Sequence, residues 1–255
     1  MKRRYFLQCS FWGEAYVGWQ KQPEMLSIQT CLDKGLSTVL QENIEVMGAG
    51  RTDTGVHATY FIAHFDAHAN LSEDKNLIYK LNNVLPNDIA VQDLFEVKLE
   101  HHARFDAITR SYQYRITTKK NPFELRSANY IKNDLDVKLM HKCAQQLLSF
   151  SNFKSFSKIK TAVKTFECQI EHAEVKSEDD LVVLNITANR FLRNMVRAIS
   201  GTLIDVGLGK NTFEDFIHII EAQDRKKAGK SVPAKGLYLT NIIYPYPLIS
   251  IYAKK

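Results

Sequence analysis

The fold of the first half of this chain is decided by residues 44–66, IEVMGAGRTDTGVHATYFIAHFD. Residues 44–47 and 59–66 are rich in apolar and β-branched side chains, which predicts two β-strands. Between them lies a segment with three glycines, in which Asp53 stands two residues after Arg51. Glycine permits positive φ and lets another molecule's backbone come close. The stretch therefore predicts two strands joined by a loop that presents one carboxylate beside a guanidinium.

The residues on either side extend this pattern to strand, helix, strand, strand, helix, strand. Residues 5–12 predict the first strand, and Ser27 is an N-cap for a helix whose apolar residues recur every four positions to residue 40. A second helix is predicted for residues 72–85, before Pro86, and a strand for residues 89–97. This order is typical of a split βαβ, ferredoxin-like unit.

The second half of the chain repeats this alternation more loosely. The expected elements are a strand at 108–117, a helix capped by Asp136, a hairpin of strands at 163–176 and 181–188, a helix from about Arg190, a helix from Asn211 with Glu214 as its capping box to residue 222, and a last strand at 236–244. The predicted fold is α+β, an α/β sandwich of two ferredoxin-like (RRM-like) domains with mainly antiparallel sheets. The expected domains are residues 1–102 and 103–255.

Composition narrows the class of protein without deciding its substrate. The chain has 255 residues, a net charge of +6 and 45% hydrophobic residues. The positive charge favours a polyanionic partner such as nucleic acid, but a small acidic substrate fits it as well. The four cysteines are far apart and form no C-x-x-C pair, which fits reduced thiols in a cytoplasm. No apolar stretch approaches the length of a membrane span, so none is expected.

The glycine-rich segment does not match a nucleotide-binding motif. A P-loop requires Lys-Ser/Thr after its second glycine, whereas Gly55 is followed by Val-His, and a dinucleotide fingerprint requires a glycine where Asp53 stands. A metal site is also disfavoured. His64 and His68 lie roughly 13 Å apart along one predicted strand, too far to share an ion.

Three groups of residues are candidates for chemistry, and each has a plain structural alternative. Asp53 is either a turn residue or a carboxylate aimed at a ligand. Arg190, Arg193 and Arg197 recur at i, i+3 and i+7, which gives either a solvated face or a cationic stripe that keeps Asp53 ionised. The predicted strand at 108–117 carries Arg110, Tyr112 and Tyr114 on one face, and the loop RKKAGKS at 225–231 carries four cations. The strand residues suit either cross-strand pairing or the stacking of a nucleobase. The cationic loop suits either solvation or contact with phosphates.

Ordered motifs along nearly the whole chain resemble those of the tRNA pseudouridine synthase A family. RTDTGVHA at 51–58 resembles its catalytic G-R-T-D-A-G-V-H. The other matching segments are YVGWQKQ at 16–22, SIQ at 27–29, NVLPNDI at 83–89, HARF at 102–105, FLRNMVR at 191–197 and PAKGLYL at 233–239. The resemblance implies isomerisation of uridine to pseudouridine at positions 38, 39 and 40 of the tRNA anticodon stem-loop. It also implies no metal, no organic cofactor, and a homodimer that docks tRNA in a basic cleft between the two domains.

The resemblance also implies roles for individual residues. Asp53 is the nucleophile, with attack at C1′, attack at C6 and removal of a ribose proton all left open. Arg197 keeps Asp53 ionised and oriented, Arg51 holds the backbone of the flipped nucleotide, and Tyr112 stacks on the base. The other expected contacts are Leu237 in the pocket and Arg193, Arg110, Arg225 and Lys226 on the RNA.

Three departures from the family pattern bear on which uridines are modified. Thr54 replaces the usual Ala, the triplet 164–166 is Lys-Thr-Phe where Arg-Thr-Pro is common, and Trp12 stands where an Asp is usual. The alternatives are a synthase for another uridine or RNA, a non-catalytic tRNA-binding protein and a metal-dependent hydrolase. Only a catalyst needs Asp53, which favours the synthase over a binding protein.

Overall fold

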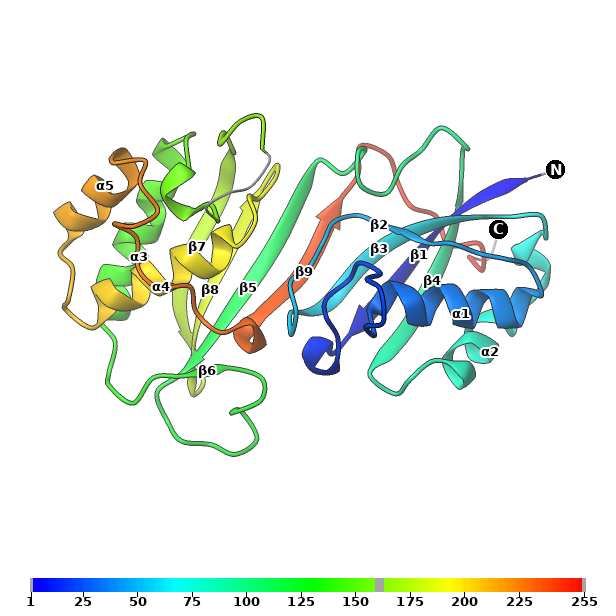
Figure 1. The fold of residues 1–255 in the computed structure, drawn as a ribbon, viewed down its shortest axis with the longest axis horizontal. Coiled ribbons are helices and arrows are strands. Elements are labelled where there is room, and N and C mark those ends of the chain that lie inside the picture. Colours follow the sequence, from blue (N-terminus) through cyan, green and yellow to red (C-terminus); the bar gives the residue numbers. More distant parts are fainter. Residues whose placement is uncertain (1, 159–162, 254–255) are drawn as a thin grey trace. The chain divides into compact units, whose positions relative to one another are not determined.

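The computed structural model describes residues 2–158 and 163–253, and its chain divides into two compact units. The first unit comprises Met1–Ile108 with Leu239–Lys255, and the second comprises Thr109–Tyr238 (Figure 1). The second unit thus begins six residues after the expected boundary at residue 103. The last 17 residues group with the first unit instead of the second.

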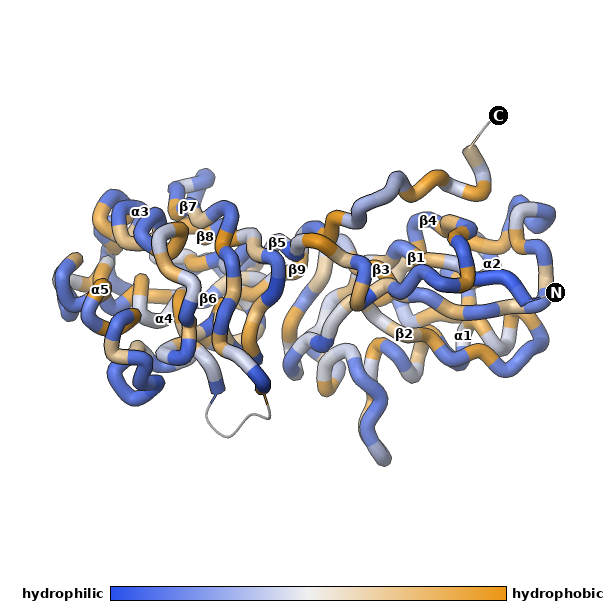
Figure 2. Tube along the Cα trace, turned by 90° about the horizontal axis from the view of Figure 1, so that it is seen from above, coloured by the Kyte–Doolittle hydropathy of each residue, from blue (hydrophilic) through white to orange (hydrophobic). Residues whose placement is uncertain are grey.

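The first unit has the element order expected from the sequence. It contains β1 (Arg3–Phe11), α1 (Ile28–Leu40), β2 (Met47–Gly48), β3 (His57–Ala67), α2 (Leu77–Val84) and β4 (Ile89–Val97). β1 lies between β3 and β4 and is antiparallel to both, and the short β2 pairs with β3. Helices α1 and α2 pack against each other. Figure 2 shows hydrophobic positions recurring along α1, which is the pattern that predicted this helix.

The core of the first unit explains why the end of the chain returns to it. Tyr5, Phe6 and Leu7 are consecutive in β1 and all fully buried, so both faces of this strand need cover. The ring of Tyr244 lies 5.3 Å from that of Phe6, and the backbone N–H of Ile251 donates to Leu94 in β4 at 2.9 Å. The C-terminal segment therefore covers the sheet of the first unit, a long-range packing that no local pattern indicated.

The second unit is also an antiparallel sheet with helices. Its elements are β5 (Thr109–Thr117), β6 (Asn129–Tyr130), α3 (Val137–Gln146), β7 (Ile170–Glu178), β8 (Leu181–Ala188), α4 (Met195–Gly207), α5 (Phe213–Glu221) and the start of β9 (Leu237–Ile243). β8 lies between β5 and β7, antiparallel to both, and β6 runs parallel to β5. The buried rings of Tyr114, Phe153, Phe156 and Phe216 belong to its core. The protein is α+β with mostly antiparallel strands, as expected.

The start of α4 corrects the predicted arginine stripe. The helix begins at Met195, not near Arg190, because Asn194 has a left-handed backbone (φ +67°). The residues before it form a loop in which Arg193 accepts a backbone hydrogen bond from Lys158 at 3.1 Å. Arg190 and Arg193 therefore do not share a helical face with Arg197.

Other boundaries also differ from those expected. α2 begins at Leu77 instead of residue 72, and the cap of α5 is Thr212 with Asp215, one residue after the expected pair. The expected strand at 163–176 begins only at Ile170, and residues 159–162 just before it lie outside the described residues. None of the helices within the described ranges combines the length and apolarity that a bilayer crossing requires.

Candidate active site

Asp53 lies in the loop of residues 49–56 that joins β2 to β3, here called the Asp53 loop. The loop starts where the N–H of Ala49 donates to Ile62 of β3 at 2.8 Å, and it closes where the N–H of Val56 donates to the Asp53 carbonyl at 3.2 Å. Gly55 has φ +78°, which glycine adopts without strain. Asp53 is half-buried and Arg51 is exposed. The loop therefore holds its carboxylate in a defined turn next to an accessible cation.

The segment of residues 16–18 packs against the Asp53 loop and is hydrogen-bonded to it. The N–H of Gly55 donates to the Tyr16 carbonyl at 3.3 Å, and the Thr54 hydroxyl donates to the Val17 carbonyl at 3.2 Å. Gly18 has φ +103°, and a Cβ there would lie 2.2 Å from the carbonyl oxygen of Thr52. Two backbone segments thus pass each other too closely for any side chain at position 18.

A second close approach fixes the end of the loop. A Cβ on Gly13 would lie 1.9 Å from the carbonyl oxygen of Val56. The N–H of Gly13 donates to Nδ1 of the buried His57 at 2.9 Å, so this ring nitrogen carries no proton. The Trp12 ring lies 3.9 Å from the imidazole of His57. Trp12, which the sequence has where an Asp is usual, therefore packs on His57, the first residue after the Asp53 loop.

Helix α1 holds the residues that lead into the loop, which corrects the strand expected at 44–47. Asp33 accepts a hydrogen bond from the N–H of Val46 at 2.8 Å, and the Gln29 amide donates to the Val46 carbonyl at 2.8 Å. Because these side chains occupy both backbone groups of Val46, the ladder with β3 is limited to Met47 and Gly48. Burial raises the pKa of the Asp33 carboxyl.

Trp19 packs against β2 and β3, the two strands that the Asp53 loop joins. The Trp19 ring stacks on that of Phe61 in β3, with ring centroids 4.1 Å apart, and a Cβ on Gly48 of β2 would lie 2.4 Å from the Trp19 ring. The motifs at 16–22 and 27–29 thus supply the residues that position the Asp53 loop. Of these residues only Ser27 had an expected role, as the N-cap of α1, and no local pattern indicated that residues 16–22 contact the Asp53 loop.

In the second unit, Tyr112 lies on β5 opposite Ile186 of β8. Its ring meets that of Phe191 edge to face, with centroids 5.1 Å apart and planes at 87°. Tyr114 is fully buried, its hydroxyl donates to the Pro233 carbonyl at 3.0 Å, and burial raises its pKa. The expected platform of two tyrosines is therefore wrong, and Tyr112 with Phe191 forms the aromatic pair instead.

Arg197 is in the first turn of α4, and its Nε donates to the carbonyl of Val232 at 2.7 Å. The segment after Lys230 packs closely on the same helix, since a Cβ on Gly201 would lie 1.9 Å from the Lys230 carbonyl oxygen. Leu237 follows at the start of β9 and is buried. The loop before β9 and the first turns of α4 therefore hold Arg197 in one orientation.

The remaining basic candidates differ in what they contact. Arg110 donates to the Asn189 carbonyl at 3.1 Å, and Arg193 is an exposed residue of the loop before α4. Arg225 donates to the carbonyls of residues 228 and 229 and to the hydroxyl of Ser231, and burial lowers its pKa. Arg225 thus shapes the 225–231 loop, whereas Lys226 is exposed on it.

The structure brings the candidates together in two groups. Asp53 and Arg51 share one loop of the first unit, whereas Tyr112, Arg197 and Leu237 belong to the second. The pairing of Asp53 with Arg197 therefore stays a prediction. Within residues 2–158 and 163–253, no three His, Cys, Asp or Glu side chains are grouped as metal ligands.

Comparison with known proteins identifies the family. A family model described as tRNA pseudouridine synthase matches residues 9–106 and 143–245. Proteins called tRNA pseudouridine synthase A are similar over almost the whole chain. The protein from Bacteroides thetaiotaomicron is 48% identical over 99% of this chain and 95% of its own length. Those from Bacteroides fragilis and Porphyromonas gingivalis are 50% and 44% identical, covering 95% and 96% of this chain and 97% and 98% of their own lengths. With its Asp53 loop inside the matched region, this chain belongs to the tRNA pseudouridine synthase family.

Proposed function

We propose that this enzyme isomerises uridine to pseudouridine at positions 38, 39 and 40 of tRNA anticodon stem-loops, with Asp53 as the nucleophile. The observation that carries the proposal is the support of the Asp53 loop by two close glycine contacts, at Gly13 and Gly18. Catalysis requires a reacting group to be held in place before the substrate arrives. A carboxylate in a rigid turn, in a chain of this family, meets that requirement.

The reaction breaks the bond between C1′ and N1 of uracil, turns the base over and forms a bond between C1′ and C5. The proton on C5 is released to solvent and N1 takes up a proton from solvent, so the product has the same composition as the substrate. The target nucleotide must leave its stack, which costs a few kcal/mol. We assign Arg51 to its backbone, Tyr112 to stacking on its base, Leu237 to the pocket wall and Arg197 to keeping Asp53 ionised.

The wider setting of the site is part of the same proposal. The strand orders of the two units, with α1 and α2 in the first and α3, α4 and α5 in the second, support two ferredoxin-like domains, and we propose a basic cleft between them for tRNA. We assign Arg110, Arg193 and Lys226 to contacts with RNA on this basis, with Arg225 shaping the loop that carries Lys226. We further propose a homodimer that acts in the cytoplasm, where the four unbonded cysteines stay reduced.

The test is release of tritium from tRNA transcripts labelled at C5 of uridine. The wild type should release tritium, whereas Asp53→Ala and the isosteric Asp53→Asn should fall below roughly one-thousandth of its rate. Both variants should still bind tRNA, because binding depends mostly on the cationic residues. The matched control is Glu45→Gln, which neutralises an exposed carboxylate just before the loop and should keep the wild-type rate.

Three outcomes would refute parts of the proposal. Tritium release by Asp53→Asn at the wild-type rate would remove Asp53 from the mechanism. Mapping of pseudouridine to positions outside 38, 39 and 40 would keep the reaction and change the target. A wild type that binds tRNA and releases no tritium would favour the non-catalytic binding protein.

A further inference from the structure

The turn of residues 102–105 exposes an aromatic ring on the surface of the first unit. Phe105 is 75% exposed, although most phenylalanines of this chain are buried. The His102 ring lies 4.3 Å from it, and the Arg104 guanidinium lies 5.7 Å from its centroid. His102 also contacts Met47, which is 51% exposed, with its Nε2 3.0 Å from the sulfur. These four residues form one exposed surface, here called the Phe105 patch.

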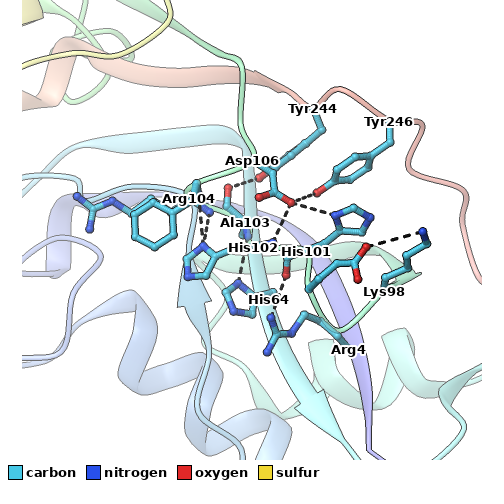
Figure 3. A network of polar contacts seen from close by, with 12 residues as sticks. Arg4, His64, Lys98, His101, His102, Ala103, Arg104, Asp106, Tyr244 and Tyr246 are labelled. Atoms are coloured by element: carbon cyan, nitrogen blue, oxygen red, sulfur yellow. Dashed lines mark hydrogen bonds and ion pairs between the residues drawn. The ribbon is translucent and has the colours of Figure 1, made fainter.

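A dense polar network holds this turn in place (Figure 3). The Asp106 carboxylate accepts from the N–H of His102 at 3.0 Å and from the Tyr246 hydroxyl at 2.6 Å. The N–H of Ala103 donates to Nδ1 of the buried His64 at 3.2 Å, and the Tyr244 hydroxyl donates to the Ala103 carbonyl at 2.6 Å. These hydrogen bonds hold the turn that carries the exposed ring, so little conformational entropy is lost when a ligand binds to the ring.

The imidazole of His102 holds the ring itself. Its Nδ1 accepts from the N–H groups of Arg104 and Phe105 at 3.1 and 3.3 Å. Burial and the charge of Arg4 lower the pKa of His102, which favours the neutral ring that can accept these bonds. The turn thus presents a phenyl face and a cation side by side.

We infer that the Phe105 patch binds an unpaired nucleobase of the substrate tRNA by stacking, away from the reacting uridine. An aromatic face with an adjacent guanidinium is the chemistry that holds unstacked bases, and the chain is positively charged overall. Phe, Met and Arg are also common at protein interfaces, so the choice of RNA over a protein partner follows from the net charge of +6 and the tRNA substrate of the family. This inference rests on the proposed function for its choice of RNA.

The position of the patch explains why it binds a second nucleotide. Met47 directly precedes the start of the Asp53 loop and pairs with His64 on β3, whereas Asp53 is held at the other end of the loop, where the N–H of Val56 donates to its carbonyl just before His57. The seven residues from His57 to His64 span roughly 20 Å along β3, which separates the patch from the end of the loop that holds Asp53. The patch therefore contributes to binding and not to the bond changes at the target.

The experiment compares KM and kcat for tritium release from C5-labelled tRNA. Phe105→Ala should raise KM by roughly 5- to 100-fold, the loss expected for one stacked base, with kcat nearly unchanged. Phe105→Trp should restore the wild-type KM because it keeps a stacking face. The control is Tyr79→Ala, which removes another exposed ring of the first unit, on α2, and should leave KM unchanged.

An unchanged KM for Phe105→Ala would overturn the inference while leaving the proposed function intact. A raised KM together with a changed oligomeric mass in size-exclusion chromatography would also overturn it, since the patch would then bind another copy of the chain. If the wild type releases no tritium, the proposed function fails. Fluorescence anisotropy with a labelled tRNA transcript then decides the inference, which requires weaker binding by Phe105→Ala and wild-type binding by Phe105→Trp.

Discussion

Gly18 is the residue that most directly sets the backbone position of Asp53. A Cβ at position 18 would lie only 2.2 Å from the Thr52 carbonyl oxygen, which leaves no room for a side chain. The positive φ of Gly18 would also be strained in any other residue. Gly18→Ala should therefore push the Asp53 loop outward by about 1 Å, which lowers kcat by roughly 100-fold. Backbone strain should also lower the free energy of unfolding by about 1–3 kcal/mol. Tritium release and urea melts measure the two effects.

The control for Gly18→Ala is Gly50→Ala in the Asp53 loop itself. A Cβ at position 50 would meet none of the described residues within 4 Å. This variant should keep its free energy of unfolding within about 0.5 kcal/mol of the wild type. Equal destabilisation by both variants would show that the contact at Gly18 does not constrain the loop.

His64 makes stability depend on pH. Its pKa is lowered to about 4, chiefly by burial and also by the charges of His102 and Arg4, against the opposing effect of Asp66 and Asp106. The ordinary histidine pKa is about 6.5, so the unfolded chain binds the proton more tightly than the folded one. The stabilising contribution is thus complete above about pH 6.5 and is lost as the pH falls toward 4.

Urea melts of the wild type and of His64→Gln at pH 7 and pH 4.5 test this sign. The glutamine oxygen can accept the hydrogen bond of Ala103 without titrating. The wild type should lose on the order of 2 kcal/mol more than the variant between the two pH values. The same loss in both proteins would assign the acid sensitivity to other groups.

At the scale of elements, the N-terminal half of α1 positions the segment that leads into the Asp53 loop. Gln29 links three segments, because it donates to Val46 and accepts from the N–H of Lys21 at 3.0 Å. Gln29→Ala should lower the free energy of unfolding by about 1–2 kcal/mol, since the carbonyl of the buried Val46 loses its hydrogen-bond partner. Hydrogen exchange should speed up in residues 44–50. Lys34→Ala, an exposed change on the same helix, should do neither.

Elements were predicted best where one local signal decided them. Ser27 caps α1 and Asp136 caps α3 as expected, each side chain accepting from a backbone N–H three residues on. The strand expected at 44–47 was mostly wrong because side chains of α1 compete for its backbone. The start of α4 was misplaced because apolar periodicity continues through Phe191, whereas the left-handed Asn194 interrupts the helix.

At the scale of the whole molecule, the net charge of +6 predicts salt-dependent binding of tRNA. The logarithm of the binding constant should fall linearly with the logarithm of salt concentration, by about 0.7–0.9 for each phosphate contact. Lys226→Gln should make this slope shallower by about 0.7–0.9, the contribution of one phosphate contact, because Lys226 is exposed on its loop. Lys34→Gln removes an equal charge from α1 and should leave the slope unchanged, as titrations at several salt concentrations would show.

The sequence by itself determined the order of strands and helices in the first unit, the glycine-flanked Asp53 and the family, because these depend on local periodicity, backbone freedom and ordered motifs. Only the tertiary structure decided that residues 239–253 cover the first sheet, that Tyr114 is core while Tyr112 meets Phe191, and that Phe105 is exposed on a rigid turn. These features depend on contacts between residues far apart in the chain. Burial on the two faces of a strand is settled by what packs there, and alternation alone does not show which face is covered.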